Sequence, residues 1–100
     1  MISYNVSVTL ESHIEMEWIA WMKTHHIPAV MATGCFESYD FYKLIKPAEE
    51  EGETFIIQYK VRDMATYDRY VEDFAPELQR ETSERYKDQV LAFRTLMVEV

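Results

Sequence analysis

The chain has 100 residues, 48% of them hydrophobic and 14% aromatic, and a formal net charge of −8 at pH 7 from 18 acidic and 10 basic side chains. This is the length of one domain, so we expect residues 1–100 to form a single domain with its own core. The acidity excludes nucleic-acid binding through a basic stripe and argues against binding to an anionic membrane surface.

Residues 2–10 alternate without a fault between apolar and polar side chains. This period of two predicts a strand with one buried face. Ser12 and Glu15 then stand at the spacing of a capping box, which would close the first turn of a helix. The helix should present two neighbouring stripes. One stripe comprises Ile14, Trp18, Trp21 and His25, and the other comprises Ile19, Met22 and His26.

Pro28 interrupts this helical pattern. Proline has no N–H and disfavours helical geometry at the preceding residue, so we expect the first helix to end near His26. Pro28 is well suited to begin a new turn over residues 28–33, which Gly34 would stop in the left-handed conformation. Residues 35–45 are rich in Phe, Tyr, Leu and Ile and predict a second strand with aromatic side chains on both faces.

Residues 46–53 contain a proline, a glycine and four glutamates and predict a solvated turn. Residues 54–62 alternate again and predict a third strand. Asp63 suits the N-cap of a second helix. The apolar stripe of that helix comprises Tyr67, Tyr70, Val71, Phe74 and Leu78. Pro76 should kink or split the helix, and residues 89–100 predict the last strand.

The element order is thus βαββαβ. Two right-handed crossovers around a hairpin give a four-stranded antiparallel sheet with both helices on one face, the ferredoxin-like α+β fold. The helices should cover the side of the sheet that carries Tyr4, Val8 and Tyr59.

The other face of this sheet is polar at its centre and apolar at its edges. Its central strands present Asn5, Ser7, Thr9, Ile56, Gln58 and Lys60. The last strand adds either Leu91, Phe93 and Met97 or Ala92 and Arg94. Such a face is too apolar to be wholly solvated and too polar to be dry core. We therefore expect a homodimer that pairs sheet to sheet and buries roughly 1,200–2,000 Å² in total.

Cys35 is the only cysteine, which excludes a disulfide framework and a cysteine metal cluster. We interpret it as a small buried hydrophobe. No apolar run approaches membrane-spanning length, and the N-terminus lacks a basic start followed by a long apolar core. These features indicate a reducing, cytoplasmic setting.

Four stretches of the chain resemble a family of small bacterial proteins of unknown function. They are Trp18-x-x-Trp21-Met22, His26-Ile27-Pro28-x-Val30-x-Ala32-Thr33-Gly34-x-Phe36, Ala75-Pro76 and Phe93-Arg94-Thr95. Such proteins are similar to the dimeric α/β barrel superfamily, in which two ferredoxin-like subunits pair through their sheets. That superfamily includes antibiotic-biosynthesis-type monooxygenases, haem-degrading monooxygenases, muconolactone isomerases and stress-response proteins. The resemblance implies the dimer but no activity, because function resides in the site.

His26 is the candidate catalytic residue, since it matches the histidine of the family stretch. Two interpretations stay open. The ring caps the last helical carbonyl groups and packs against Trp18 or Met22, or it faces a ligand and moves a proton. The neighbouring His25 points about 100° away on a regular helix, so the pair should not address one target. No further ligands stand at a useful spacing, and we expect no metal site.

A candidate binding group for a small anionic or carbonyl-bearing molecule comprises Asn5, Ser7, Gln58, Lys60 and Arg94. Arg94 belongs to it only if its side chain points to the uncovered face. The alternative is hydrogen bonding across a dimer interface. Asn5 also resembles an asparagine that faces the haem in the haem-degrading enzymes. Those enzymes carry an axial histidine on the second helix, whereas residues 63–88 contain none, so we expect no haem or other cofactor.

We see no nucleophile with a recognisable base and no glycine-rich phosphate loop. The sequence therefore favours a homodimeric domain that binds a small ligand or a partner without catalysis. The alternative is a cofactor-independent monooxygenase or isomerase that acts on a small aromatic or lactone-like substrate in the barrel interior. A cavity of roughly 300 Å³ or more lined by Asn5, Gln58 and Arg94 would favour this alternative.

Overall fold

A computed structural model describes residues 1–47 and 51–100, so Glu49 and Glu50 of the predicted turn lie outside the described residues. Four strands form one antiparallel sheet in the order β2–β3–β1–β4. The strands are β1 (Ile2–Leu10), β2 (Ser38–Lys43), β3 (Glu53–Val61) and β4 (Val90–Val98). This order confirms the predicted ferredoxin-like fold.

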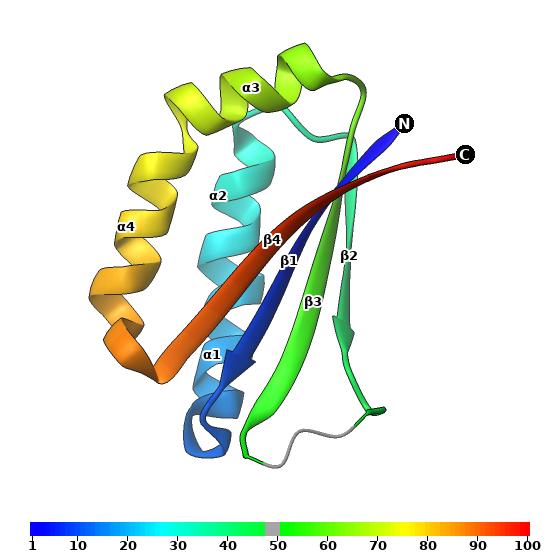
Figure 1. Cartoon of the computed structure of the whole chain (residues 1–100). Helices are drawn as coiled ribbons and strands as arrows, with labels where there is room; N and C mark the ends of the chain where they lie inside the picture. The colour runs from blue at the N-terminus through cyan, green and yellow to red at the C-terminus, as the bar shows by residue number, and fades with distance from the viewer. Residues whose placement is uncertain (48–50) are drawn as a thin grey trace.

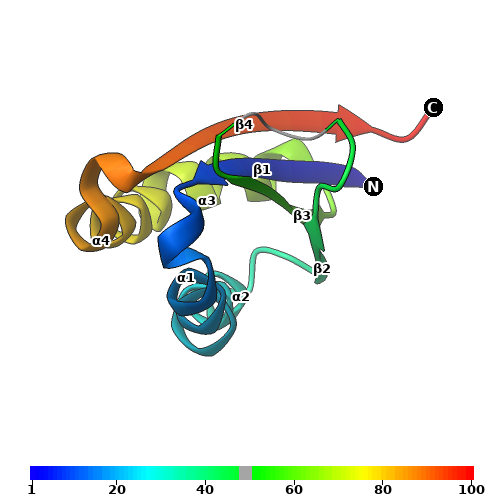
Figure 2. The same ribbon diagram turned by 90° about the horizontal axis from the view of Figure 1, so that it is seen from below.

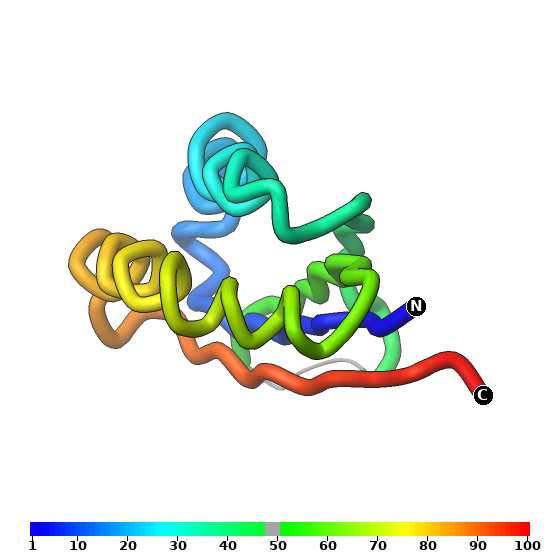
Figure 3. The backbone as a smooth tube through the Cα atoms, turned by 90° about the horizontal axis from the view of Figure 1, so that it is seen from above, coloured from blue at the N-terminus to red at the C-terminus, as the bar shows by residue number. Residues whose placement is uncertain are grey.

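Two helical segments cover one face of the sheet (Figures 1 and 2). The first runs through a 3₁₀ turn (Ser12–Ile14), α1 (Glu15–Trp21), a π-helical turn (Met22–His26) and α2 (Ile27–Ala32). The second consists of α3 (Met64–Asp73), α4 (Ala75–Tyr86) and a 3₁₀ turn (Lys87–Gln89). Both chain ends lie at the same end of the sheet (Figure 3).

The core lies between the helices and the sheet and is rich in aromatic rings. Alternate residues of β1 and β3 point into it, as predicted, and their register places Tyr4 opposite Tyr59. The strands contribute Tyr4, Val8, Leu10, Phe55, Ile57, Tyr59 and Val61. The helical segments contribute Trp18, Trp21, Met22, Ile27, Val30, Tyr70, Ala75, Leu78 and Tyr86. Burial of these side chains is the main source of stability.

The start of the first helical segment differs from the predicted capping box. A 3₁₀ turn contains Ser12, and the N-cap positions, Glu11 and Ile14, make no side-chain hydrogen bond to the backbone. The Glu15 carboxylate instead accepts a hydrogen bond of 2.7 Å from the Lys43 ammonium on β2. The prediction is wrong because this charge-assisted bond takes the carboxylate that the box would use.

The break expected at His26 is also wrong, since the segment stays helical through Pro28 to Ala32. The backbone of His26 itself is helical, with φ −70° and ψ −53°. The π-helical turn (Met22–His26) widens the helix just before Pro28, so the missing proline N–H removes no regular hydrogen bond and the ring clears the preceding turn. Gly34 follows at φ +76°, which confirms the predicted glycine exit.

The second helical segment begins and breaks where the sequence predicts. Asp63 caps α3 and accepts hydrogen bonds from the Thr66 backbone N–H at 2.8 Å and from its hydroxyl at 2.6 Å. Pro76 stands at the start of α4, and the non-helical Phe74 separates α4 from α3. One member of the predicted apolar stripe, Val71, is exposed, because the split helix turns a narrower face to the sheet.

On the face of the sheet turned away from the helices, several central polar side chains form hydrogen bonds within one chain. Ser3 Oγ donates a hydrogen bond of 2.8 Å to Asn5 Oδ1. The Thr9 and Thr54 hydroxyl groups lie 2.9 Å apart across β1 and β3. Asn5 Nδ2 lies 3.5 Å from Thr95 Oγ1 on β4. We call this surface the uncovered face.

The register of β4 decides which of its residues the uncovered face carries. Ser7 lies opposite Phe93, and Val6 lies opposite Arg94. Leu91, Phe93 and Met97 therefore lie on the uncovered face, where they are 59%, 61% and 50% exposed. We call these three residues the β4 apolar row. Arg94 lies on the helix side of the sheet.

Candidate functional site

A cavity of about 50 Å³ lies between the sheet and the helices, and a more open cavity of about 210 Å³ adjoins it. The residues that line both are Gln79, Thr82, Val90, Ala92 and Arg94. Because these residues come from α4 and β4, the two cavities form one recess that opens between these elements. We call this recess the α4–β4 pocket.

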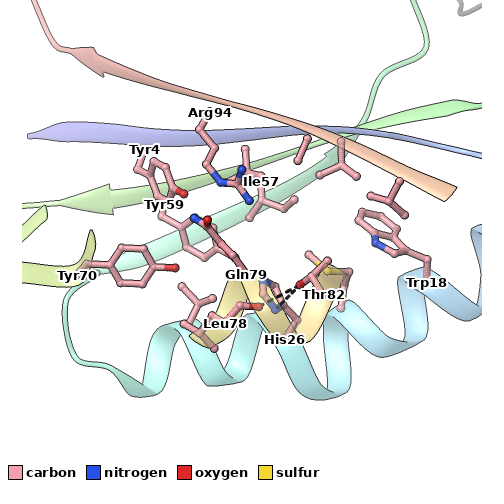
Figure 4. Close-up of a pocket in the computed structure, with 16 residues that line it drawn as sticks. Tyr4, Trp18, His26, Ile57, Tyr59, Tyr70, Leu78, Gln79, Thr82 and Arg94 are labelled. Carbon is pink, nitrogen blue, oxygen red and sulfur yellow. Dashed lines mark hydrogen bonds between the residues drawn. The ribbon is translucent and has the colours of Figure 1, made fainter. Parts of the chain in front are cut away.

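The inner part of the α4–β4 pocket has apolar walls and a few polar tips (Figure 4). The apolar residues that line it are Val6, Val8, Trp18, Met22, Val30, Ile57, Leu78, Val90 and Ala92. The polar or partly polar residues are Tyr4, His26, Tyr59, Tyr70, Gln79, Thr82 and Arg94. Small-molecule sites typically combine an apolar wall with a few converging polar groups in this way.

His26 lies in the pocket wall beside α4. Its ring stacks on the indole of Trp21, with ring centroids 5.2 Å apart, and its Nδ1 lies 3.5 Å from the hydroxyl oxygen of Thr82. Burial lowers the pKa of His26 to about 4, although the nearby Glu81 carboxylate opposes the shift. The imidazole is therefore neutral at pH 7. It does not cap the last carbonyl groups of the helix, because the helix continues beyond it.

His25 stacks on the same indole, with ring centroids 5.5 Å apart, and its Nε2 pairs with the Glu81 carboxylate on α4. Both rings therefore contact one indole, while their polar partners differ, Glu81 for His25 and Thr82 for His26. That the pair does not address one small target stays a prediction. This prediction assumed a regular α-helix. In the π-helical turn the residues four and five positions after Trp21 straddle the direction of its side chain, so both rings contact it.

Arg94 brings a positive charge to a group of neutral phenols. Figure 4 shows its side chain reaching from β4 into the pocket beside Tyr4. Burial raises the pKa of Tyr4, and the Arg94 charge opposes this shift. Burial also raises the pKa of Tyr59 and of Tyr70 far above the ordinary value. The three phenols therefore stay protonated near neutral pH, and each can donate a hydrogen bond.

The structure divides the predicted binding group between two faces. Asn5, Ser7, Gln58 and Lys60 lie on the uncovered face, and Arg94 lies on the helix side. Asn5, Gln58 and Arg94 therefore cannot line one cavity within one chain, because the sheet separates them. Arg94 instead joins His26 in the α4–β4 pocket. Ligand binding by either group stays a prediction.

Sequence reasoning missed Tyr4, Tyr70, Gln79 and Thr82 as pocket residues. Tyr4 and Tyr70 belong to apolar stripes, and such stripes predict core packing alone. Their hydroxyl groups are the available signal, because a buried tyrosine usually needs a polar partner that a phenylalanine would not. Gln79 and Thr82 share one face of α4 at a spacing of three. No sequence signal links Thr82 to His26, which lies 56 positions away.

The residues of the pocket do not fit a haem. The inner cavity of about 50 Å³ is far smaller than a porphyrin, and α3 and α4 carry no histidine. Asn5, the match to the haem-facing asparagine of the resembling enzymes, lies on the opposite face of the sheet from the pocket. The residues that the structure describes also contain no group of three His, Cys, Asp or Glu side chains that could hold a metal ion.

The fold and the recess define a ferredoxin-like α+β protein with a pocket between its sheet and its helices. The chain belongs to the family described as a domain of unknown function (DUF4286), which matches residues 1–100. This confirms the predicted resemblance to a family of unknown function. No curated protein matches the chain. Within residues 1–47 and 51–100, every helix is too short or too polar to cross a membrane.

Several solved structures share the fold at low sequence identity. HapK from Hahella chejuensis is 9% identical, with a TM-score of 0.72 over 100% of this chain and 93% of that chain. A dimeric ferredoxin-like protein from an uncultured marine organism is 13% identical, with a TM-score of 0.62 over 99% and 97%. A MhuD variant with manganese protoporphyrin IX bound is 12% identical, with a TM-score of 0.67 over 100% and 95%. These likenesses show the fold alone.

Proposed function

We propose that this protein is a homodimer that binds a small molecule in the α4–β4 pocket without catalysing a reaction on it. The pocket itself is the observation that carries the proposal. Its inner part is bounded by side chains from β1, β3, β4 and both helical segments, so its shape depends on the whole fold. A domain of this size buries only a limited apolar core, so an unfilled recess within that core costs stability. A recess between the helices and the sheet therefore favours a role in binding.

The polar groups of the pocket have hydrogen-bonding capacity to spare. The contact between His26 Nδ1 and the Thr82 hydroxyl is 3.5 Å long, which is longer than a good hydrogen bond. Each partner can therefore turn to a ligand without losing a strong bond. Gln79 lines both cavities and adds an amide that donates and accepts.

The homodimer is proposed from the β4 apolar row. Leu91, Phe93 and Met97 expose at least half of their surface, and they lie beside a polar strip in which Ser3, Asn5, Thr9 and Thr54 are already hydrogen-bonded. A second copy packed sheet to sheet would remove this row from water. One of the structures that share the fold is described as a dimeric ferredoxin-like protein, which supports the same arrangement.

A second group for a small anionic or carbonyl-bearing ligand would lie between the paired sheets. It comprises the four uncovered-face residues Asn5, Ser7, Gln58 and Lys60. We favour this group less than the α4–β4 pocket as a ligand site, because the side chain of Asn5 already contacts Ser3 and Thr95. Its alternative role is hydrogen bonding between the two subunits.

Native mass spectrometry of the purified protein tests both parts of the proposal. The expected spectrum shows the dimer mass with a co-purifying small molecule. Ala92 lines both cavities, so Ala92→Phe should fill the pocket and remove the bound molecule. Ala65→Phe places the same ring on an exposed site of α3 and should keep it. A monomer mass contradicts the dimer, and a bound molecule that survives Ala92→Phe contradicts the pocket.

One observation favours the second candidate function, a cofactor-independent monooxygenase or isomerase. A neutral imidazole faces the pocket and can accept a proton from a bound substrate. The pKa of His26, lowered to about 4, makes it a weak base at pH 7, which is why we favour binding over catalysis. If His26→Ala and His26→Gln change stability and affinity but never turnover of a co-purified molecule, catalysis by this residue is excluded.

We also propose a reducing, cytoplasmic setting. Cys35 is buried as a free thiol, and its Sγ accepts a hydrogen bond of 3.3 Å from the Arg69 guanidinium. This environment protects a thiol and gives it a structural partner. Fractionation of cells that express the protein checks the location.

A further inference from the structure

We infer that the α4–β4 pocket selects a small monoanion, a carboxylate attached to a single ring, over a neutral molecule of the same shape. This inference rests on the proposed function, because it names the class of ligand that the pocket would take.

The charge of the pocket is opposite to that of the protein. The chain carries 18 acidic side chains against 10 basic ones. Yet the described residues that line the two cavities include the cations Lys87 and Arg94 and no Asp or Glu. A carboxylate on a ligand would therefore meet attraction here and repulsion over most of the remaining surface.

Arg94 has no carboxylate partner of its own among the residues that the structure describes. The arginine–carboxylate ion pairs there belong to Arg62, Arg80 and Arg85. Arg94 is itself exposed and lies at the mouth of the pocket, from which its guanidinium reaches the phenol of Tyr4 (Figure 4). Guanidinium presents a planar fork of donors that matches the two oxygens of a carboxylate. A ligand anion would supply the missing counter-charge.

The neighbouring polar groups suit an acceptor oxygen. The phenols of Tyr4, Tyr59 and Tyr70 stay protonated, since burial raises the pKa of each. In Figure 4 the hydroxyl groups of Tyr4 and Tyr70 point into the same space as the Arg94 guanidinium. A protonated phenol donates readily to a negatively charged oxygen, and such bonds are stronger than those to a neutral oxygen.

The shape of the recess limits the ligand to about one ring. The inner cavity holds about 50 Å³ and the outer one about 210 Å³, which together fall below the usual size of a site for a drug-sized molecule. Trp18, Ile57 and Leu78 give the inner part apolar walls, but this part alone is too small for a ring. A ring would therefore occupy the outer cavity beside Val90 and Ala92, with its anionic group beside Arg94 where the two cavities meet.

Benzoate and benzyl alcohol are matched probes, because both carry one ring and only benzoate carries a charge at pH 7. Each is titrated into the full-length protein while amide NMR signals of the pocket and of the uncovered face are followed. We expect benzoate to shift pocket signals with an affinity about tenfold or more above that of benzyl alcohol, the size of one charge-assisted contact. Arg94→Met should abolish this preference, and Arg94→Lys should keep part of it. Lys23→Met removes a positive charge from an exposed position that lines neither cavity and should leave the preference intact.

The inference is overturned if both probes bind the pocket equally, if the preference survives Arg94→Met, or if Lys23→Met reduces it as much as Arg94→Met does. In these cases the pocket still accepts a ring, so the proposed function stands. If neither probe shifts a pocket signal, the inference and the binding role of the pocket both fail. A preference that depends on Arg94 and is unaffected by Lys23→Met supports the inference.

Discussion

The imidazole of His26 stacks on the indole of Trp21, five positions earlier in the chain, with ring planes 23° from parallel. An α-helix has 3.6 residues per turn, so a side chain five positions after Trp21 would point well away from the Trp21 side chain. The π-helical turn (Met22–His26) brings the two rings together. Pro28 follows two positions later and favours this widening of the helix, because its ring would clash with a regular preceding turn. A proline that predicts a helix end thus places a histidine in the pocket wall.

Acid should destabilise the protein through His26. Its pKa is lowered to about 4 in the folded protein by burial, against about 6.5 in the unfolded chain. Between these values the unfolded chain binds more protons at this ring, so stability falls as the pH falls through the window. The full loss is about 3 kcal/mol. Urea unfolding of the wild type and of His26→Gln at pH 7 and pH 4 should show the variant losing less.

Three charged or titratable groups act on the ring besides burial: Glu81 on α4, the adjacent His25, and Arg94 on β4. All three are present in both proteins, so they largely cancel in the comparison. His25→Gln is the matched control, because His25 is exposed. It should keep most of the acid sensitivity of the wild type, because burial, the largest cause of the lowered pKa of His26, is unchanged. If His26→Gln loses as much stability as the wild type between the two pH values, the buried neutral ring is not its source.

Gly52 should tolerate alanine far less well than Gly34. Both have positive φ, +83° and +76°, which costs an L-residue about 1–2 kcal/mol. At Gly52 a Cβ would also lie 2.4 Å from the Leu10 carbonyl oxygen, whereas at Gly34 it meets nothing within 4 Å. We expect Gly52→Ala to cost about 3 kcal/mol or more and Gly34→Ala about 1 kcal/mol in urea unfolding. Equal losses would mean that the chain around Gly52 moves freely.

The alternation of residues 2–10 and 54–62 was enough to predict the two central strands and their buried face. Both strands lie at the middle of the sheet with helices on one side only, where period two is a direct record of burial. Local signals also predicted the Asp63 cap and the Gly34 exit. The predicted capping box is absent because Glu15 pairs with Lys43, which is distant in the chain. The predicted break at Pro28 is absent because a π-helical turn, an uncommon helix type, precedes the proline. Neither leaves a local trace.

The candidate site was predictable only in part. His26 was named from a motif, but Arg94 was assigned with residues of the wrong face. On β4 the larger apolar residues of the β4 apolar row point away from the core, so a rule that sends apolar residues inward chooses the wrong set. The correct choice needs the register that places Arg94 opposite Val6. That register is a property of the folded sheet rather than of the strand.

Haemin should not bind. A structure of similar fold, a MhuD variant, holds manganese protoporphyrin IX. Here the inner cavity of about 50 Å³ is too small, and the imidazole of His26 is already packed on Trp21. Titration of haemin should leave its Soret band unshifted. A Soret shift that disappears in His26→Gln would contradict the prediction.

The β4 apolar row should hold two subunits together. Phe93 lies on the uncovered face and Leu96 on the helix side of the same strand, and both are partly exposed, by 61% and 39%. A charge at the centre of a packed interface loses its water without gaining a partner, which costs several kcal/mol. Sedimentation at micromolar concentration should therefore find a dimer for the wild type, a monomer for Phe93→Asp and a dimer for Leu96→Asp. A monomeric wild type would contradict the proposed homodimer. A dimeric Phe93→Asp variant would mean that the interface lies elsewhere on the molecule.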